Sequence, residues 1–277
     1  MENKEALLPL LRERAYFCRR ETVRLIAIAK SGHYGSVFSA AEILAALYYH
    51  VLRYDSQHPD WPERDRFILS KGHAAVGLYP ILADVGFFDA TLLDSYTRLG
   101  SPFGDHPDMT KIPGVDFSSG SLGHGLSVGV GMALAARVTG RDYRVYVLLG
   151  DGELDEGQVW EAAMSASHFG LGNLVAIVDR NRVSVDGDTA EVMDIEPLPD
   201  KWAAFGWQVL QVDGHDLESL LNCSARLPDP ASSQPTVIVA HTVAGKGVSF
   251  MEDRFEWHLG HLAPEDQARA LAELERD

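Results

Sequence analysis

The sequence is poor in cysteine and in basic residues, and it contains no long apolar run. Its two cysteines, Cys18 and Cys223, are far apart and form no Cys-x-x-Cys pair, so we expect neither a metal cluster nor a redox pair. Lys and Arg total 24 against 40 Asp and Glu, and the formal net charge of −16 argues against a nucleic-acid-binding surface, which needs a basic stripe. No apolar run approaches the length of a membrane span. We therefore expect a protein of a reducing compartment, with the cytoplasm as the default.

Apolar residues recur at spacings that alternate between helical and extended segments. Hydrophobic residues make up 46% of the 277 residues, a globular composition. We expect helices over 4–30, 40–51, 74–85, 126–136, 157–169 and 216–221, and strands over 66–70, 143–149, 174–178, 208–212 and 236–240. Ser39, with Glu42 three residues later, is the expected N-cap of the second helix. Strands that alternate with helices indicate a parallel α/β sheet with helices on both faces, in one domain over 1–277 with an N-terminal helical layer.

Oxygen-bearing side chains follow two of these strands. The apolar run 143–149 ends in Gly150-Asp151-Gly152, and the run 174–178 is followed by Asp179-Arg180-Asn181. A hard divalent cation such as Mg²⁺ takes oxygen ligands, a few from protein and the rest from phosphate and water. Glycine lets the backbone approach a phosphate closely, and the following helix points its N-terminus at it. The pattern predicts a Mg²⁺–diphosphate site at the carboxyl edge of the sheet, and an acidic turn that only caps a helix is the alternative.

Gly-Asp-Gly, a spacer of just under thirty residues and then Asn resembles the signature of enzymes that bind thiamine diphosphate. The resemblance implies thiamine diphosphate and Mg²⁺, or Ca²⁺ or Mn²⁺ in its place. It also implies three metal ligands: the side chains of Asp151 and Asn181 and the carbonyl of Val183. Gly150 and Gly152 would bind the metal–diphosphate with them.

Four histidines lie beside glycines in segments without regular structure. They occur in Gly32-His33-Tyr34-Gly35, Lys71-Gly72-His73, Gly104-Asp105-His106 and Gly123-His124-Gly125. Scattered core histidines would not cluster in this way. The last two segments belong to a loop-rich stretch over 99–125, and so long a loop inside a compact domain is more often functional than disordered.

Taken together, these segments resemble the N-terminal, diphosphate-binding half of transketolase, from about residue 15 to about residue 262. The resemblance implies that His33 lies beside the reactive carbon of the cofactor, that His73 touches the diphosphate and that His106 contacts the donor sugar. Near the C-terminus, Trp257-His258 resembles the segment whose histidine completes the pocket. His261 lies three residues later, and we choose His258 because it directly follows Trp257.

The same resemblance assigns further cofactor contacts. It implies that the Gly120–Gly123 loop, with Gly120, Leu122 and Gly123, packs on the aminopyrimidine ring, and that Glu156 lies at the subunit interface near the cofactor. Lys246, in Gly245-Lys246-Gly247, could reach the diphosphate as a point charge, and a solvated loop lysine is the alternative.

The chain departs from single-chain transketolases in two respects. Tyr34 and His124 replace the more usual Pro and Gln, and a single-chain transketolase is more than twice as long. The part beyond this length contains the pyrimidine-binding domain with its activating glutamate. The resemblance thus implies the N-terminal subunit of a split transketolase of pentose phosphate type, active only with a separately encoded C-terminal subunit, in two copies of each chain. It would transfer a two-carbon ketol unit from a ketose or its phosphate to an aldose or its phosphate.

Other functions stay open at this point. Within the family, a deoxyxylulose-phosphate synthase or another ketol-transfer subunit shares the half-domain, and a binding subunit without catalysis is also possible. A Rossmann-type oxidoreductase is the alternative outside it, but no clear strand leads into Gly120-x-x-Gly123-x-Gly125, so the dinucleotide fingerprint fails. The residues do not indicate which sugars react or whether they carry phosphate.

Overall fold

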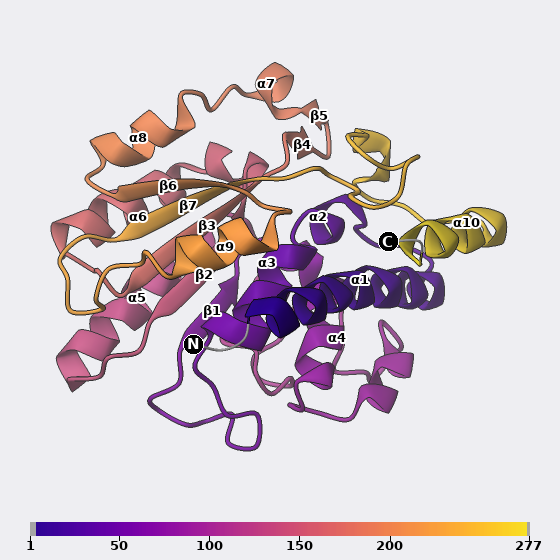
Figure 1. Cartoon of the computed structure of the whole chain (residues 1–277), viewed down its shortest axis with the longest axis horizontal. Coiled ribbons are helices and arrows are strands. Elements are labelled where there is room, and N and C mark those ends of the chain that lie inside the picture. The colour runs from indigo at the N-terminus through magenta and orange to yellow at the C-terminus, as the bar shows by residue number, and fades with distance from the viewer. Residues whose placement is uncertain (1–3, 276–277) are drawn as a thin grey trace.

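The structure, a computed structural model, describes residues 4–275 and is built on a five-stranded parallel sheet. Residues 1–3 and 276–277 of the expected domain lie outside this range. The strands are β1 (Arg66–Leu69), β2 (Val145–Gly150), β3 (Leu174–Arg180), β6 (Gln208–Asp213) and β7 (Thr236–His241), in the order β1-β2-β3-β7-β6. The predicted parallel α/β fold is confirmed (Figure 1).

Helices cover both faces of this sheet because side chains alternate along each strand. On one face, Phe67, Tyr146 and Ile177 pack with the buried residues of the N-terminal helices. That layer contains α1 (Lys4–Ala29), α3 (Ala41–Ala46), α4 (Ala75–Asp84) and α9 (Leu217–Ser224). The predicted N-terminal helical layer is therefore present.

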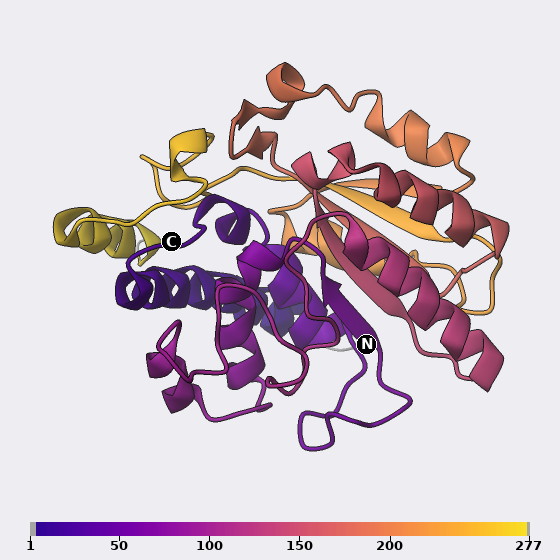
Figure 2. The ribbon, with the colours of Figure 1, turned by 180° about the vertical axis from the view of Figure 1, so that it is seen from behind.

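On the other face, Val147 and Ala176 pack against α5 (His124–Thr139) and α6 (Gly157–His168), which contact each other (Figure 2). Trp202 of α8 (Leu198–Ala204) is fully buried in the same cluster. All seven residues of β3 are buried, and each large aliphatic side chain buried in this way contributes about 1.5–3 kcal/mol. The centre of the sheet is thus packed on both faces, and this packing supports the residues at its carboxyl edge.

The parallel register brings the two predicted ligand-bearing turns together. Gly150 at the end of β2 pairs with Asp179 near the end of β3. Asp151 and Asn181 follow these positions on neighbouring strands, so the structure places them at the same edge of the sheet.

Several short elements differ from the expectation or were not anticipated. Ser39 is not an N-cap: it ends α2 (Gly35–Phe38), its hydroxyl donates to Asp179 Oδ2, and α3 begins after Ala40, followed by a π-helical turn over Leu47–Val51. The further elements are β4 (Val183–Ser184), β5 (Gly187–Asp188), α7 (Thr189–Val192), α10 (Pro264–Leu274) and 3₁₀ turns over Gly72–Ala74, Ala90–Ser95, Gly152–Asp155 and Phe255–Trp257. Within residues 4–275, no helix has the length and apolarity needed to span a bilayer.

Candidate active site

A cavity of about 200 Å³ lies at the carboxyl edge of β1, β2 and β3. It is lined by most of the residues that the sequence singled out, namely His73, Leu122, Gly150, Asp151, Gly152, Asn181, Val183 and His258. These residues come from segments that are up to 185 positions apart, from 73 to 258, so the fold alone brings them together.

Asp151 is held in place by donors from both strand ends. Its Oδ1 accepts a hydrogen bond from Gly152 N at 2.9 Å, and its Oδ2 accepts from Arg182 N at 2.6 Å. The guanidinium of Arg180 donates to the same Oδ2 at 2.9 Å, and both side chains are almost fully buried. Burial raises the pKa of Asp151 to about 6, against the opposing effect of Arg180. A bound cation would favour the ionised carboxylate and lower this pKa.

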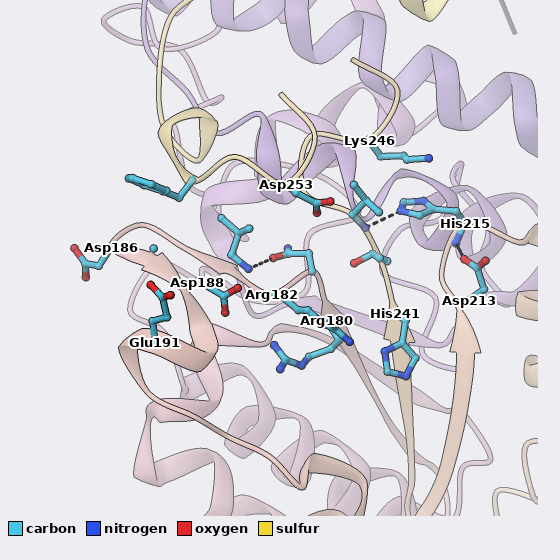
Figure 3. A pocket seen from close by; sticks show the side chains of 16 residues that line it. Arg180, Arg182, Asp186, Asp188, Glu191, Asp213, His215, His241, Lys246 and Asp253 are labelled. Atoms are coloured by element: carbon cyan, nitrogen blue, oxygen red, sulfur yellow. Dashed lines mark hydrogen bonds between the residues drawn. The ribbon is translucent and has the colours of Figure 1, made fainter. Parts of the chain in front are cut away.

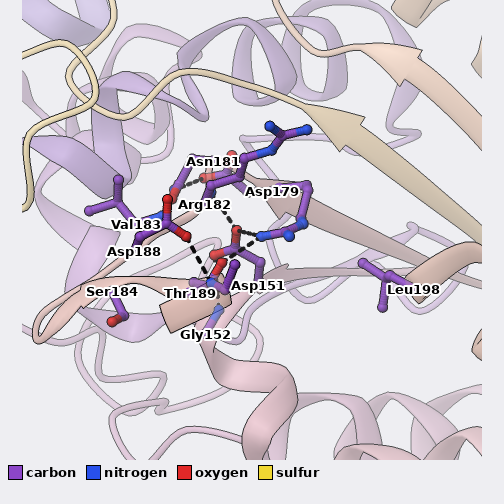
Figure 4. Close-up of polar contacts among 12 residues, drawn as sticks. Asp151, Gly152, Asp179, Asn181, Arg182, Val183, Ser184, Asp188, Thr189 and Leu198 are labelled. Carbon is purple, nitrogen blue, oxygen red and sulfur yellow. Dashed lines mark hydrogen bonds and ion pairs between the residues drawn. The ribbon is translucent and has the colours of Figure 1, made fainter. Parts of the chain in front are cut away.

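Asn181 and Val183 lie next to Asp151 (Figure 4). Asn181 Oδ1 accepts from Val183 N at 3.0 Å, which fixes the amide with its nitrogen toward Ser39 and Asp179. The turn depends on Arg182, whose φ of 66° lies in the left-handed region, which is uncommon for a residue other than glycine. Local strain of this kind persists only where the surroundings enforce it, and here the bond from Arg182 N to Asp151 does so.

The donor set suits a hard cation that completes its coordination with phosphate oxygens. One carboxylate, one amide and one backbone segment supply only oxygen ligands. Among the described residues, no group of three or more His, Cys, Asp or Glu side chains could hold a metal by itself. The cavity also contains the hydroxyl of Ser36, which is buried and has no hydrogen-bond partner within the described chain. An unpaired buried hydroxyl is costly, so these residues fit a bound, strongly accepting group such as a diphosphate.

Lys71 and Asp179 form a buried ion pair beneath this cavity. The ammonium of Lys71 donates to Asp179 Oδ2 and to Ser36 O at 2.6 Å, and neither charged side chain is more than 1% exposed. Ser39 and Thr242 donate their hydroxyls to the two oxygens of Asp179. Lys71 lines the cavity, so it combines a buried positive charge with access to the ligand space.

Three histidines form a cluster over the cavity. The ring centroid of His33 lies 4.8 Å from that of His73 and 5.6 Å from that of His258, and the last two are 5.6 Å apart. Burial, together with His33 and Lys71, lowers the pKa of His73 to about 2 and that of His258 to about 4. Burial also lowers the pKa of His33. All three imidazoles are therefore uncharged near neutral pH, and each keeps a ring nitrogen that can accept a hydrogen bond.

His106 lies at the rim of this cluster rather than within it. Its side chain is 44% exposed and stands near Asp105, whose carboxylate is also 4.0 Å from His33 Nδ1. A Cβ at Gly120 would be 3.6 Å from the His106 ring, so the ring packs on the glycine loop. His261, the alternative to His258, is exposed and does not line the cavity.

The glycine loop approaches the turn after β2 closely. Gly123 has a φ of 81°, and a Cβ there would lie 2.7 Å from Glu156 Cβ, so only glycine fits. Glu156 is exposed at the start of α6 and does not line the cavity. Leu122 of the same loop does line it.

Lys246 lies elsewhere, on a larger neighbouring cavity of about 1020 Å³. Its ammonium is 3.5 Å from Glu252, and Figure 3 shows Lys246 on the opposite side of this cavity from Asp186 and Glu191. The two cavities share Asn181, Val183 and Asp186. The structure thus separates Lys246 from the other candidate cofactor contacts.

Sequence reasoning missed five site residues, which are Ser36, Lys71, Glu153, Asp179 and Arg180. Signals were present for three of them. Lys71 lies inside the segment Lys71-Gly72-His73, Glu153 directly follows Gly150-Asp151-Gly152, and Asp179 directly follows the apolar run 174–178. A charged residue in a strand that is otherwise apolar, such as Asp179 in β3, requires a buried partner, and this pattern could have identified it.

Comparison with known proteins assigns the chain to a family. A family described as "Transketolase, thiamine diphosphate binding domain" matches residues 13–274. One of the subunits of the apulose-4-phosphate transketolase of Phocaeicola vulgatus is 42% identical over 256 residues, which cover 92% of this chain and 90% of that protein. The 6-deoxy-6-sulfo-D-fructose transketolase subunit SqwG of Clostridium sp. (strain MSTE9) is also 42% identical, over 96% of this chain and 97% of that protein.

Solved structures agree with these matches. Transketolase from Leishmania mexicana has a TM-score of 0.89 at 33% identity and covers 96% of this chain, which spans 41% of that protein. Transketolase from Campylobacter jejuni has a TM-score of 0.90 at 31% identity, over 97% of this chain and 43% of that protein. The chain thus spans about two fifths of these transketolases but nearly the whole of the two subunits above.

The matches bear directly on the sequence-based predictions. The predicted transketolase resemblance, the N-terminal subunit of a split enzyme and the transferase class are confirmed, because relatives matched along nearly their whole length are named transketolase subunits. The Rossmann-type oxidoreductase is not favoured. This chain belongs to the family of transketolase thiamine diphosphate-binding domains.

Proposed function

We propose that this chain is the diphosphate-binding subunit of a two-chain transketolase and transfers a two-carbon ketol unit from a ketose to an aldose. The observation that carries the proposal is the convergence of Asp151 and Asn181 with His73 and His258 on one cavity at the carboxyl edge of the sheet. A metal–diphosphate site and a group of proton acceptors within one cavity meet the needs of this reaction.

The cofactor of the proposal is thiamine diphosphate with a divalent cation, Mg²⁺ or, in its place, Ca²⁺ or Mn²⁺. When bound, thiamine diphosphate supplies the carbanion-stabilising chemistry that no amino-acid side chain offers. The side chains of Asp151 and Asn181 and the carbonyl of Val183 would hold the cation. Gly150 and Gly152 would allow the diphosphate to approach, and the 3₁₀ turn that follows carries backbone N–H groups at the same edge.

Further residues of this chain would contact the diphosphate and the aminopyrimidine of the cofactor. His73 would donate to the diphosphate, and Gly120, Leu122 and Gly123 would pack on the aminopyrimidine. We keep Lys246 as a weaker candidate for the diphosphate, because it lies on the neighbouring cavity and pairs with Glu252.

His33, His258 and His106 would move the protons of the reaction. His33 Nδ1 is buried without a hydrogen-bond partner within the described chain, and His258 is uncharged near neutral pH because of its lowered pKa. Each can take a proton from a sugar hydroxyl and return it, which is the usual role of imidazole. His106, more exposed and beside Asp105, is placed to contact the donor's hydroxyl groups.

The partner of the proposal is a separately encoded C-terminal subunit with a pyrimidine-binding domain. Two relatives of matching length are named subunits, and the single-chain transketolases are more than twice as long as this chain. We propose an assembly of two copies of each chain. Candidate contact surfaces are the outer side of α5, where Val138 is 86% exposed, and the segment at Glu156 and Met164 of α6.

The substrates of the proposal are sugars as a class. The two relatives are named for apulose 4-phosphate and for 6-deoxy-6-sulfo-D-fructose, both of which carry an anionic group. We therefore propose a ketose donor and an aldose acceptor, of which at least one carries an anionic terminus. The single domain and the cytoplasmic location expected from the sequence stay predictions.

The test is reconstitution with the partner subunit. The two chains are purified together, thiamine diphosphate binding is measured by circular dichroism with Mg²⁺, and ketol transfer is measured with a panel of phosphorylated and unphosphorylated ketoses. We expect cofactor binding and transfer by the complex, and clearly weaker cofactor binding by a complex that contains Asp151→Ala. A wild-type complex that binds no thiamine diphosphate would contradict the proposal.

A further inference from the structure

Glu153 is a buried carboxylate to which the function proposed above assigns no role. Its side chain lies two residues beyond Asp151, and the residue is 2% exposed. Oε1 accepts hydrogen bonds from Ser70 Oγ and from Gly123 N at 2.9 Å, and Oε2 accepts from Gly150 N at 3.0 Å. Within the described chain, three donors from three distant segments thus meet on one carboxylate.

Each of these donors belongs to a segment that borders the cavity. Ser70 precedes the segment that carries Lys71 and His73, Gly123 ends the glycine loop, and Gly150 directly precedes Asp151. The packing at this junction is close, because a Cβ at Gly125 would lie 2.3 Å from Ser70 Oγ. We call the turn after β2 that carries Asp151 the metal turn. The Glu153 carboxylate therefore links the metal turn, the segment that carries Lys71 and His73, and the Gly120–Gly123 loop.

The chemistry of the three bonds requires a carboxylate. All three partners donate, so both oxygens must accept. Glutamine has one acceptor oxygen and one donor NH₂ group. Whichever way the amide of Glu153→Gln is turned, its NH₂ faces a backbone N–H, of Gly123 in one orientation and of Gly150 in the other.

We propose that Glu153 is a positioning residue that holds the glycine loop at the distance from the metal turn at which both halves of the cofactor bind. The inference rests on the proposed function, since the loop and the turn are the expected contacts of the aminopyrimidine and the diphosphate. Glu153 acts through Gly123 and Gly150, and its effect falls on cofactor affinity.

Asp65 offers a matched control at the opposite edge of the sheet. Its Oδ1 accepts from Arg144 N at 2.8 Å and its Oδ2 from Arg53 N at 2.9 Å, and the residue is 9% exposed. Asp65→Asn therefore creates the same conflict between an amide NH₂ and a backbone N–H, but at the amino ends of β1 and β2, away from the cavity. It should lower thermal stability without changing cofactor affinity.

The experiment compares Glu153→Gln, Asp65→Asn and wild type in the complex with the partner subunit. Each complex is tested for its melting temperature without cofactor and for its apparent Kd for thiamine diphosphate with Mg²⁺, by circular dichroism. We expect both variants to melt at a lower temperature. Glu153→Gln should raise the apparent Kd about 10- to 100-fold, the range for a lost hydrogen bond to a charged group. Asp65→Asn should leave it within about twofold, the scatter expected for a site that is untouched.

A milder variant keeps the test decisive if Glu153→Gln does not fold. Ser70→Ala removes one donor and introduces no opposed N–H groups, so it should fold and raise the Kd by a smaller factor in the same direction. Unchanged affinity in the Glu153→Gln complex, or in Ser70→Ala when the first variant is insoluble, would overturn the inference. A wild-type complex without cofactor affinity would contradict the proposed function instead, so the two failures are distinguishable.

Discussion

Replacing Asp151 by Ala should weaken Mg²⁺–thiamine diphosphate binding more than replacing Asn181 by Ala. Asp151 is 1% exposed and is the carboxylate among the three proposed ligands, whereas Asn181 supplies a neutral amide oxygen. In Asp151→Ala the guanidinium of Arg180 loses its contact with Asp151 at 2.9 Å and keeps its ion pair with the half-exposed Glu196 at 3.0 Å. The cation therefore loses an attractive charge, while the positive charge of Arg180 stays beside it.

The magnitude follows from the charges. A unit charge about 4 Å from another contributes about 4 kcal/mol at an effective dielectric constant near 20. Because the carboxylate and the cation both give up hydration when they meet, which offsets part of this attraction, we expect about half of it, or roughly 2 kcal/mol and about a 30-fold higher Kd. Asn181→Ala removes one neutral ligand and should cost about 1 kcal/mol, or roughly fivefold.

The assay is calorimetric titration of the assembled complex, with the melting temperature of the cofactor-free complex as the measure of folding. Adding Arg180→Met to Asp151→Ala removes the positive charge that repels the cation, so the double variant should regain part of the lost affinity. Wild-type affinity in Asp151→Ala, or a larger effect of Asn181→Ala, would refute the assignment of Asp151 as the charged ligand. No recovery in the double variant would refute the electrostatic part of the argument.

The remaining predictions concern chemistry, stability and assembly. His33→Ala and His106→Ala should lower kcat/KM about 10²- to 10⁴-fold with little change in cofactor Kd, whereas His73→Ala should mainly raise that Kd; equal effects of all three on both quantities would show the roles to be wrong. Burial opposes ionisation of Glu42, but Arg19 and His215 outweigh it and lower the pKa of Glu42 from 4.5 to about 2. The resulting stability, about 3 kcal/mol, is present above the unfolded pKa and is lost as pH falls through the folded one. Glu42→Gln should therefore flatten the acid limb of urea-unfolding stability, and an unchanged limb would contradict this. The purified chain alone should show no ketol transfer and should gain it when the partner subunit is added; transfer at ordinary enzyme rates by the single chain would refute the two-chain proposal.

The sheet and its ligand-bearing edge could be predicted from the sequence because they depend on local patterns. The runs 145–149 and 174–178 are apolar along their whole length, which is typical of strands buried on both faces. Parallel strands end at one edge, so the residues after such runs must meet there. The pairing of Gly150 with Asp179 confirms this consequence in the structure.

Helix boundaries near the N-terminus depend on tertiary contacts that the local sequence does not reveal. Ser39 and Glu42 match the capping-box spacing, but the Ser39 hydroxyl bonds to Asp179, 140 residues away, and Glu42 pairs with Arg19. Side chains that find buried tertiary partners do not cap helices, and nothing in the local sequence reveals those partners. The histidine cluster has the same origin, since His33, His73 and His258 meet only through the fold.

Several buried charged side chains of the candidate site form ion pairs or hydrogen bonds with other groups of the described chain. Lys71 is paired with Asp179, Asp151 with Arg180, and Glu153 with two backbone N–H groups and a hydroxyl, all of them buried. Each pair fixes the orientation of a group that the proposed cofactor must contact. The conformational cost of ordering these groups is therefore met during folding rather than during binding, which favours affinity. The same arrangement reduces the repulsion that a net charge of −16 would exert on an anionic cofactor: Asp151 and Asp179 are paired with Arg180 and Lys71, and a cation between Asp151 and the diphosphate would reverse the local field.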